Sequence, residues 1–405
     1  MNFKGIKIII LLTAGMFINA IDRGSLGIAA PMIIKELHID SGIMGIALSA
    51  FYWSYIVLMF PIGRFSDKYG AKKTLGWSAV IWSCMSAVTG FVHSAHFLIL
   101  ARLGVGAGEA AGNVVSAKIV SENFPSNERA TATGFYLSGT KLGMAAVPVL
   151  MGVLMANWNW RVAFLVTGLI SLLWCVAWYY GFKEVSQPVE VTSVSTKVAI
   201  PWKKLLANRC VLGLMIAKFF LDYLFILFVT WVPAYLIMER GFSVLKMGIY
   251  ASLPWIAGFI SQPAMGYFSD WLIKKGIDVT PARKYTLVAF QLIAASVLAV
   301  GYIDDPVIAC ILLTINVAAE SASAGIMWTI LAEVSPRKLG GTVPAAINTV
   351  SSIAGLFAPT ITGFIYQFTG SFQIALFVGG CGVLISALAI LFIVPDIKPI
   401  QLQED

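Results

Sequence analysis

The sequence predicts an all-α membrane protein with twelve transmembrane helices, arranged as two pseudo-symmetric bundles of six helices. Three observations lead to this fold class. First, the 405 residues are 59% hydrophobic and 12% charged, with a mean hydropathy of +0.84, whereas soluble domains average about 45–50% apolar and ~25% charged residues. Second, apolar windows of about 20 residues, long enough to cross ~30 Å of hydrocarbon as helices, recur twelve times. Third, a short charged motif occurs in both halves of the chain.

The twelve windows follow one another along the whole chain. They lie near residues 8–30, 42–63, 73–94, 97–120, 130–156, 160–182, 208–236, 244–268, 284–303, 306–332, 341–364 and 371–394. The first window follows Lys4 and Lys7, as the apolar part of a signal peptide would. Asp22 and Arg23 interrupt it, however, and the apolar pattern continues to Pro31 without a convincing cleavage site. We therefore expect a retained first helix.

The basic residues indicate how the helices are oriented. When the amino terminus is placed in the cytoplasm, most of the 28 Lys and Arg residues fall in cytoplasmic segments. Those on the outer side are Lys35, Arg161, Arg240 and Lys246. This bias predicts that both termini are cytoplasmic. The net charge of +8 is then a property of the cytoplasmic loops, and we expect no nucleic acid partner. Five basic residues remain at membrane depth: Arg23, Arg102, Lys118, Lys141 and Lys218.

The segment 183–207 is the longest polar interval of the chain. It carries Ser, Thr, Pro and Lys without a spanning run, so we expect a cytoplasmic linker with a short surface helix near Trp202–Leu206. The linker divides the chain into an amino-terminal six-helix bundle, residues 1–182, and a carboxyl-terminal six-helix bundle, residues 208–405.

The two predicted bundles share a motif. GRFSDKYGAKK occupies Gly63–Lys73 after the second window, and GYFSDWLIKK occupies Gly266–Lys275 after the eighth. A duplicated six-helix unit is typical of transporters with substrate sites near the bilayer midplane.

The first copy of the motif resembles the motif of the major facilitator superfamily between its second and third helices, and the likeness extends over the whole chain. The matching residues are Gly63, Asp67, Gly70 and Lys72, with Asp270 in the second copy. The resemblance implies the major facilitator fold. It also implies that Asp67 caps and holds a neighbouring helix end while the basic residues stabilise the cytoplasmic side of the outward-facing state.

Several longer stretches are similar to the anion:cation symporter family, in particular to its bacterial sugar-acid members. They are IDRGSLGIA, SAFYWSY, RLGVGAGEAAGN, FPSNERATATGFYLSG, TWVPAYLIMERGFSVLKMGIYASLP and FSDWLIKKGIDVTPARK. Members of this family are secondary transporters without a prosthetic group, and they often drive an organic anion inward with protons. The resemblance therefore implies a proton-coupled importer with no cofactor.

Asp22 and Arg23 are neighbours within an apolar window. A charge at bilayer depth costs at least ~2.5–3.5 kcal/mol on the insertion scale, which favours a functional role. On a helix the two side chains point about 100° apart, so each is expected to face a different neighbour. The resemblance implies that Asp22 binds a proton and that Arg23 binds the substrate carboxylate, a task that suits a planar guanidinium. The alternative is a permanent salt bridge that fixes helix packing.

Arg102 and Glu109 lie seven residues apart, on one face of the fourth window. Burial favours the neutral acid and a nearby guanidinium favours the carboxylate, so Glu109 is the second candidate proton carrier. By resemblance, Arg102 tunes the two acids. The alternative is that Arg102 permanently neutralises Glu109 or Asp22. The same helix carries glycines expected to allow close packing: Gly104, Gly106, Gly108 and Gly112.

Lys141 lies in the middle of the fifth window, where similar galactonate transporters carry an uncharged amide. A second cation would favour a substrate with an extra negative charge, or it would pair with Asp22 or Glu109. Lys218 and Asp222 are spaced i, i+4 and are expected to form an internal salt bridge, with a gating role as the alternative. Glu320 either faces a cavity or packs against small residues.

Three further residues belong to the expected pocket by resemblance only. Tyr55 would offer a hydroxyl, Asn348 an amide, and Trp328 a flat ring for the C–H side of a polyol chain. The tenth window departs from the family pattern, since Gly325 and Met327 replace polar residues. This departure puts galactonate itself in doubt as the substrate.

The expected function is import of a small organic anion, most simply a sugar acid, by proton symport and alternating access in the bacterial inner membrane. The expected partners are the anion, protons and the lipid bilayer, and the family expectation is a monomer. The alternatives are an exchanger or a symporter for a dicarboxylate or aromatic acid, and a non-transporting nutrient sensor. No motif for an enzyme and no His/Cys cluster for a metal is present in the sequence.

Overall fold

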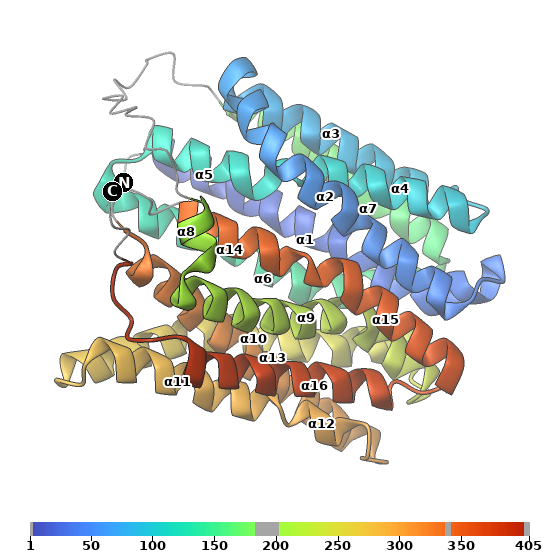
Figure 1. The fold of residues 1–405 in the computed structure, drawn as a ribbon. Coiled ribbons are helices and arrows are strands. Elements are labelled where there is room, and N and C mark those ends of the chain that lie inside the picture. The colour runs from blue at the N-terminus through green and yellow to red at the C-terminus, as the bar shows by residue number, and fades with distance from the viewer. Residues whose placement is uncertain (1–2, 183–201, 337–341, 401–405) are drawn as a thin grey trace. The chain divides into compact units, whose positions relative to one another are not determined.

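The computed structural model describes residues 3–182, 202–336 and 342–400, and every regular element in these residues is helical (Figure 1). The amino-terminal half contains α1 (Phe3–Leu37), α2 (Ser41–Tyr69), α3 (Ala71–Thr89), α4 (Ala95–Glu109), α5 (Ala111–Asn123), α6 (Ser126–Asn157) and α7 (Trp160–Gly181). The carboxyl-terminal half contains α8 (Trp202–Ala207), α9 (Arg209–Met238), α10 (Val244–Lys274), α11 (Val279–Ala294), α12 (Val297–Val300), α13 (Pro306–Val334), α14 (Thr342–Ser352), α15 (Ala354–Thr369), α16 (Gln373–Leu388) and the π-helix η2 (Ala389–Ile393).

Among the described residues, eleven helical stretches are long and apolar enough to cross a membrane, and each corresponds to a predicted window. Four of them combine two elements: α4 with α5, α11 with α12, α14 with α15, and α16 with η2. The remaining predicted window, near residues 73–94, forms α3. This helix has 19 residues but is less apolar, because Lys72 and Lys73 lie in its first turn and several of its residues are Ser or Thr. The prediction of an all-α, multi-pass membrane protein is confirmed.

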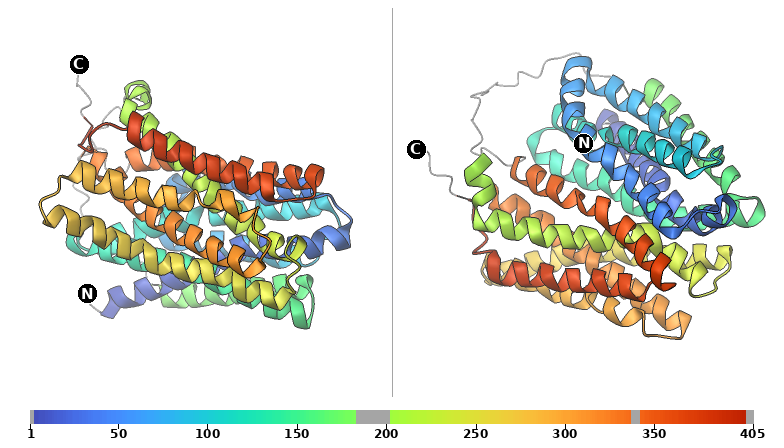
Figure 2. Two further views of the ribbon diagram at one scale, coloured as in Figure 1. Left: turned by 90° about the horizontal axis from the view of Figure 1, so that it is seen from below. Right: turned by 45° about the vertical axis from the view of Figure 1, so that its right-hand side comes forward.

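The described chain forms two compact units. The first unit comprises residues 3–182 and 230–252, and the second comprises residues 202–229, 253–336 and 342–400. Within each unit the long helices run alongside one another, as the further views in Figure 2 show. Most of the predicted linker lies outside the described residues, but the short helix expected near Trp202–Leu206 is present as α8.

In the first unit, α1 packs along α6 and α7, and α3 packs between α4 and α7. Three of the predicted small residues allow the close approach of α4 to its neighbours. A Cβ on Gly106 would lie 2.0 Å from the Phe51 carbonyl oxygen, one on Gly108 would lie 2.6 Å from the Trp82 backbone nitrogen, and one on Gly104 would lie 2.5 Å from Met85 Cγ. Gly112 differs, because its nearest neighbour would be 3.6 Å away. The prediction of tight packing therefore applies to α4 and stops before α5.

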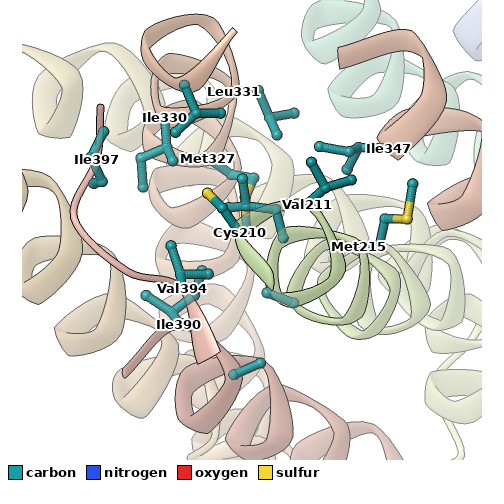
Figure 3. Packing of buried hydrophobic residues seen from close by; sticks show 14 of the residues in the cluster. Cys210, Val211, Met215, Met327, Ile330, Leu331, Ile347, Ile390, Val394 and Ile397 are labelled. Carbon is teal, nitrogen blue, oxygen red and sulfur yellow. The ribbon is translucent and has the colours of Figure 1, made fainter. Parts of the chain in front are cut away.

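The second unit contains an apolar core in which several chain segments converge, including α11 through Leu287 and Val288 (Figure 3). Side chains from α9, α13, α14 and the segment around η2 meet there, and those labelled in the figure are Cys210, Val211, Met215, Met327, Ile330, Leu331, Ile347, Ile390, Val394 and Ile397. Leu205 of α8 is also fully buried in this core, so α8 packs onto the unit with one apolar side chain. Met327, which replaces a polar residue of the family pattern, is a core residue here.

Candidate functional site

Asp22 lies on α1 with none of its surface exposed. Its two carboxylate oxygens accept hydrogen bonds from two hydroxyl groups on other helices. Ser86 Oγ of α3 donates to Oδ1 at 2.6 Å, and Ser171 Oγ of α7 donates to Oδ2 at 2.7 Å. Asp22 is therefore held between three helices by neutral donors.

Arg23 faces a different neighbour, as predicted. Its Nε and Nη2 donate to Glu109 Oε2 on α4, at 3.2 and 3.0 Å, and Nη2 also donates to Asn19 Oδ1 at 3.5 Å. The Glu109 side chain is completely buried in this ion pair, while the Arg23 side chain keeps 16% of its surface exposed. A buried salt bridge, as the alternative interpretation expected, is therefore present, but it joins Arg23 to Glu109 and not to the adjacent Asp22.

Arg102 is buried beside this pair with only 2% of its surface exposed. Its Nε and Nη1, and the Oε1 of Glu109, have no hydrogen-bond partner within the described part of the chain. The guanidinium carbon lies 5.8 Å from the centre of the Phe51 ring. Among the described residues, Glu109 forms its ion pair with Arg23 and not with Arg102. Buried groups with unused hydrogen-bonding capacity are unusual in proteins and point to a site that changes partners.

Two aromatic side chains of α2 line the Arg23 guanidinium. The Arg23 guanidinium carbon lies 5.0 Å from the Phe51 ring centre and 5.4 Å from the Tyr55 ring centre, and the two rings stack at 5.4 Å. Cation–π contacts of this kind hold a guanidinium in place without consuming its N–H donors. Tyr55 therefore belongs to the Arg23 environment.

Lys141, also predicted for the pocket, lies partly buried halfway along α6, the helix that packs along α1.

The other members of the expected pocket lie in the second unit. Trp328 of α13 is 46% exposed, and Asn348 of α14 is partly buried. The expected Lys218–Asp222 salt bridge is present within α9 at 2.7 Å, and the Lys218 ammonium lies 5.2 Å from the Trp328 ring centre. Glu320 is 2% exposed and accepts a hydrogen bond from Ser321 Oγ, so it is packed among small residues of α13.

The first motif is helical over most of its length. The two helices extend beyond the apolar windows that end near residue 63 and begin near residue 73, because α2 continues to Tyr69 and α3 begins at Ala71. Gly70 alone separates the two helices, with φ 87° and ψ 153°, a conformation open to glycine and strained for other residues. Polar residues can extend a helix beyond the hydrocarbon, so the end of the apolar run did not mark the end of the helix.

Asp67 forms an ion pair and not the predicted helix cap. Its Oδ1 accepts a hydrogen bond from Lys118 Nζ near the end of α5, at 2.7 Å, so it holds the neighbouring helix through a side chain. The Lys72 ammonium lies 5.5 Å from the Tyr179 ring centre. In the second copy of the motif, Asp270 pairs with Arg283 of α11 at 2.7 Å, and Arg283 pairs with Glu333 of α13 at 3.0 Å.

Four side chains of the site were not recognised in the sequence: Asn19, Phe51, Ser86 and Ser171. A serine in an apolar window is only a weak signal of a functional site, because its hydroxyl can hydrogen-bond to a backbone carbonyl of its own helix. Ser25 does so, donating to the Ile21 carbonyl at 2.6 Å. Ser86 and Ser171 differ from Ser25 only in what the fold brings next to them.

A family model of the Major Facilitator Superfamily matches residues 12–359 of this chain. The chain belongs to the major facilitator superfamily. It is similar to a hexuronate transporter of Bacillus subtilis (strain 168), with 34% identity over 97% of this chain and 95% of the relative. It is also similar to a probable galactarate/D-glucarate transporter of Escherichia coli (strain K12), with 30% identity over 98% of this chain and 95% of the relative.

Solved structures show the same major facilitator fold. A D-xylose–proton symporter superposes with a TM-score of 0.82 at 15% identity, covering 98% of this chain and 99% of that one. A bacterial homologue of the human lysosomal transporter Spinster, in an inward-facing and occupied conformation, superposes with a TM-score of 0.76 at 17% identity, covering 96% of this chain and 94% of that one. The predicted fold, two halves of the major facilitator type, is confirmed.

Membership of this superfamily makes the chain a multi-pass membrane transporter and not an enzyme. For a transporter, the arrangement in the first unit provides two kinds of chemistry. Asp22 and Glu109 are buried acids that can exist in charged and neutral forms. Arg23 is a fixed cation with part of its surface accessible, suited to an anion.

Proposed function

We propose that this transporter imports a small sugar acid together with protons, by alternating access, in the inner membrane of a bacterium. The names of its relatives, which include a hexuronate and a probable galactarate/D-glucarate transporter, support the substrate class. The distribution of Lys and Arg supports an orientation with both termini in the cytoplasm. The working unit in this proposal is the monomer.

The observation that carries the proposal is the buried Arg23–Glu109 ion pair. A substrate carboxylate that binds Arg23 competes with Glu109 for the same N–H donors, because both Nε and Nη2 now point to Glu109 Oε2. Once displaced, Glu109 would be a buried carboxylate without its main cationic partner, a state that favours protonation. Binding of the anion and binding of the proton therefore favour each other.

Asp22 supplies the first proton site in this scheme. Protons reach Asp22 and Glu109 from the outside, the anion displaces Glu109 from Arg23, and the loaded protein changes conformation and releases its ligands inside. Coupling requires that anion and protons favour the same conformational change through their different affinities for the two states. Arg102 stands beside both acids and would adjust their charge balance without contacting the substrate.

Two pairs of motif residues are proposed to stabilise one conformation of the cycle. Asp67 with Lys118, and Asp270 with Arg283, join helix ends within each unit. These pairs keep one partner well exposed, at 73% for Asp67 and 55% for Asp270. Exposed pairs contribute ~0–1 kcal/mol each, a size that biases a conformational equilibrium without locking it.

The direct test is uptake of labelled sugar acids into proteoliposomes with an imposed proton gradient. The unaltered protein should accumulate the acid, and Glu109→Gln should lose gradient-driven accumulation while retaining exchange of labelled for unlabelled substrate. Full accumulation by Glu109→Gln would show that the second proton site is wrong. Countertransport by the unaltered protein that survives collapse of the proton gradient would instead favour an exchanger.

The substrate is found by a second measurement. A ligand that binds the native state raises thermal stability with its occupancy, so a panel of monocarboxylate and dicarboxylate sugar acids can be ranked on the purified protein. We propose that Arg23, Tyr55 and Lys141 in the first unit, and Trp328 and Asn348 in the second, contribute to binding. Substitution of each should reduce the stabilisation given by the best acid.

A further inference from the structure

Ser171 differs from the other hydroxyl group at Asp22. Its Oγ lies 2.7 Å from Asp22 Oδ2 and 3.0 Å from the carbonyl oxygen of Thr167, one turn earlier on α7. A serine hydroxyl carries one hydrogen, so it can donate to one of these acceptors at a time. In the described part of the chain, Ser86 Oγ donates to a single acceptor, Asp22 Oδ1 at 2.6 Å.

This difference decides where a proton can be accommodated on Asp22. When the carboxylate is charged, Ser86 and Ser171 both donate to it. When Oδ2 is protonated, the new O–H can donate to Ser171 Oγ, and the Ser171 hydrogen can turn to the Thr167 carbonyl. A proton on Oδ1 would have to donate to Ser86 Oγ, and the hydrogen of Ser86 would then have no other acceptor at hydrogen-bond distance among the residues that the structure describes.

We propose that Ser171 is a positioning residue for proton binding, which directs the proton to Asp22 Oδ2 and keeps every hydrogen bond satisfied in both charge states. This inference rests on the proposed function of Asp22 as a proton site. One O–H bond forms, between Oδ2 and a proton delivered by water, and Asp22 changes from a charge of −1 to zero. Ser171 keeps its own proton and only rotates.

Other charged and titratable groups surround Asp22 besides the two serines. The charged and titratable groups that face it are Arg102 and Glu109 from α4 and the Cys175 thiol from α7. Arg23 on its own helix is directed at Glu109, and α6, which packs along α1, carries Lys141 within its span. Because these groups are shared, the two serine-to-alanine variants form a matched pair.

The pair makes a quantitative prediction. Ser86→Ala removes a donor that stabilises mainly the charged carboxylate, so Asp22 should keep its proton to a higher pH, by roughly one pH unit. Ser171→Ala removes one hydrogen bond from the charged form and one from the neutral form. Its shift should therefore be less than half as large. The measurement is the pH dependence of proton-driven uptake by the full-length protein in proteoliposomes.

An infrared difference spectrum distinguishes this role from a purely structural one, because the carboxyl band would stay unchanged if Ser171 only supported helix packing. The carboxyl band of protonated Asp22, assigned by its loss in Asp22→Asn, should shift in Ser171→Ala, because the acid O–H loses its acceptor. Ser171→Cys has a similar size and a weaker acceptor, and should give an intermediate shift even if the alanine variant folds poorly.

Equal pH shifts for the two alanine variants, or an unchanged carboxyl band in Ser171→Ala, would overturn the role of Ser171 and leave Asp22 as the proton site. Failure of the proposed function is a different result. It would appear as full gradient-driven uptake by Asp22→Asn.

Discussion

The two units are built from the same type of helix bundle but bury different chemistry. In the first unit, the ion pair between α1 and α4 has a completely buried carboxylate, Glu109, and fully buried Asp22 lies on the same helix as Arg23. In the second unit, the ion pairs around Lys218 and Arg283 have carboxylate partners that are 25–55% exposed. Its centre is instead the apolar core of α9, α13, α14 and the segment around η2.

The difference separates function from stability. A buried ion pair adds little net stability, because desolvation offsets most of the attraction, but removing one partner is costly. An apolar core stabilises the fold and performs no chemistry. We therefore expect substitutions in the first unit's charged cluster, Asp22, Arg23, Arg102 and Glu109, to affect transport more than stability. Substitutions in the second unit's apolar core should affect stability more than transport.

The largest effect is expected for Arg23→Gln. Removing one partner of a buried, hydrogen-bonded charge pair costs about 2–5 kcal/mol, so uptake should fall by roughly 30-fold or more. Arg23→Lys keeps the charge but loses the planar guanidinium with its several N–H donors, so its uptake rate should lie between those of the unaltered protein and Arg23→Gln. The comparison is with Lys218→Gln in the second unit, whose uptake rate should fall much less. Initial uptake rates in proteoliposomes, normalised to folded protein, measure all three.

A larger loss for Lys218→Gln than for Arg23→Gln would break the comparison. It would place the anion-binding chemistry in the second unit, at the Lys218–Asp222 pair and the Trp328 ring.

The next largest effect is expected for two glycines with positive φ, one in each unit. Gly70 lies within the first copy of the motif and Gly276 directly follows the second, and both have positive φ, 87° and 93°. Substitution by alanine should destabilise the protein by about 1–3 kcal/mol at either position. Gly63→Ala is the control, because a Cβ there would meet its nearest atom, Val114 Cγ1, at 3.9 Å within a regular helix. Thermal unfolding in detergent measures the difference, and an equal loss in Gly63→Ala would contradict the conformational explanation.

The number and order of the membrane helices could be predicted, because hydropathy and charge are properties of the sequence itself and do not depend on tertiary contacts. The ends of the helices could not be predicted in this way. α2 extends to Tyr69 through charged residues, since a helix leaving the bilayer needs only water or side chains around it. The interruption between α4 and α5 at Ala110 has no mark in an apolar, glycine-rich sequence.

The charged half of the candidate site could also be predicted, since Asp22, Arg23, Arg102 and Glu109 interrupt apolar windows at a known cost. Its neutral half could not. Ser86 and Ser171 look like Ser25 in the sequence, and only the packing of α1 against other helices turns two of the three into partners of Asp22. The pairing of Arg23 with Glu109 is of the same kind, because it joins residues 86 positions apart.

A smaller effect tests the second unit's core. Ile330→Val removes one methyl group from a side chain that is 1% exposed, and should cost about 0.5–1.5 kcal/mol. Ile315→Val on the same helix is the control, since Ile315 is 43% exposed and lipid is as apolar as the side chain it contacts. Uptake per folded molecule should be unchanged in both. An uptake defect in Ile330→Val at full stability would mean that this core takes part in transport.

The effect expected at Lys141 is confined to one class of substrate, and it determines which substrate suits the charged cluster of Asp22, Arg23, Arg102 and Glu109. If Lys141 binds a second negative group, Lys141→Gln should weaken binding of a dicarboxylate such as galactarate by about tenfold, ~1.4 kcal/mol, with little effect on a monocarboxylate such as galactonate. Lys246→Gln removes the same charge from an exposed position on α10 and should change neither affinity. If Lys141 instead holds Asp22 or Glu109, the two acids should weaken equally and the pH dependence of uptake should move, because an acid that loses a cationic neighbour keeps its proton to a higher pH. Comparing the two acids at two pH values therefore tells whether the first unit's cluster carries one anion-binding cation or two.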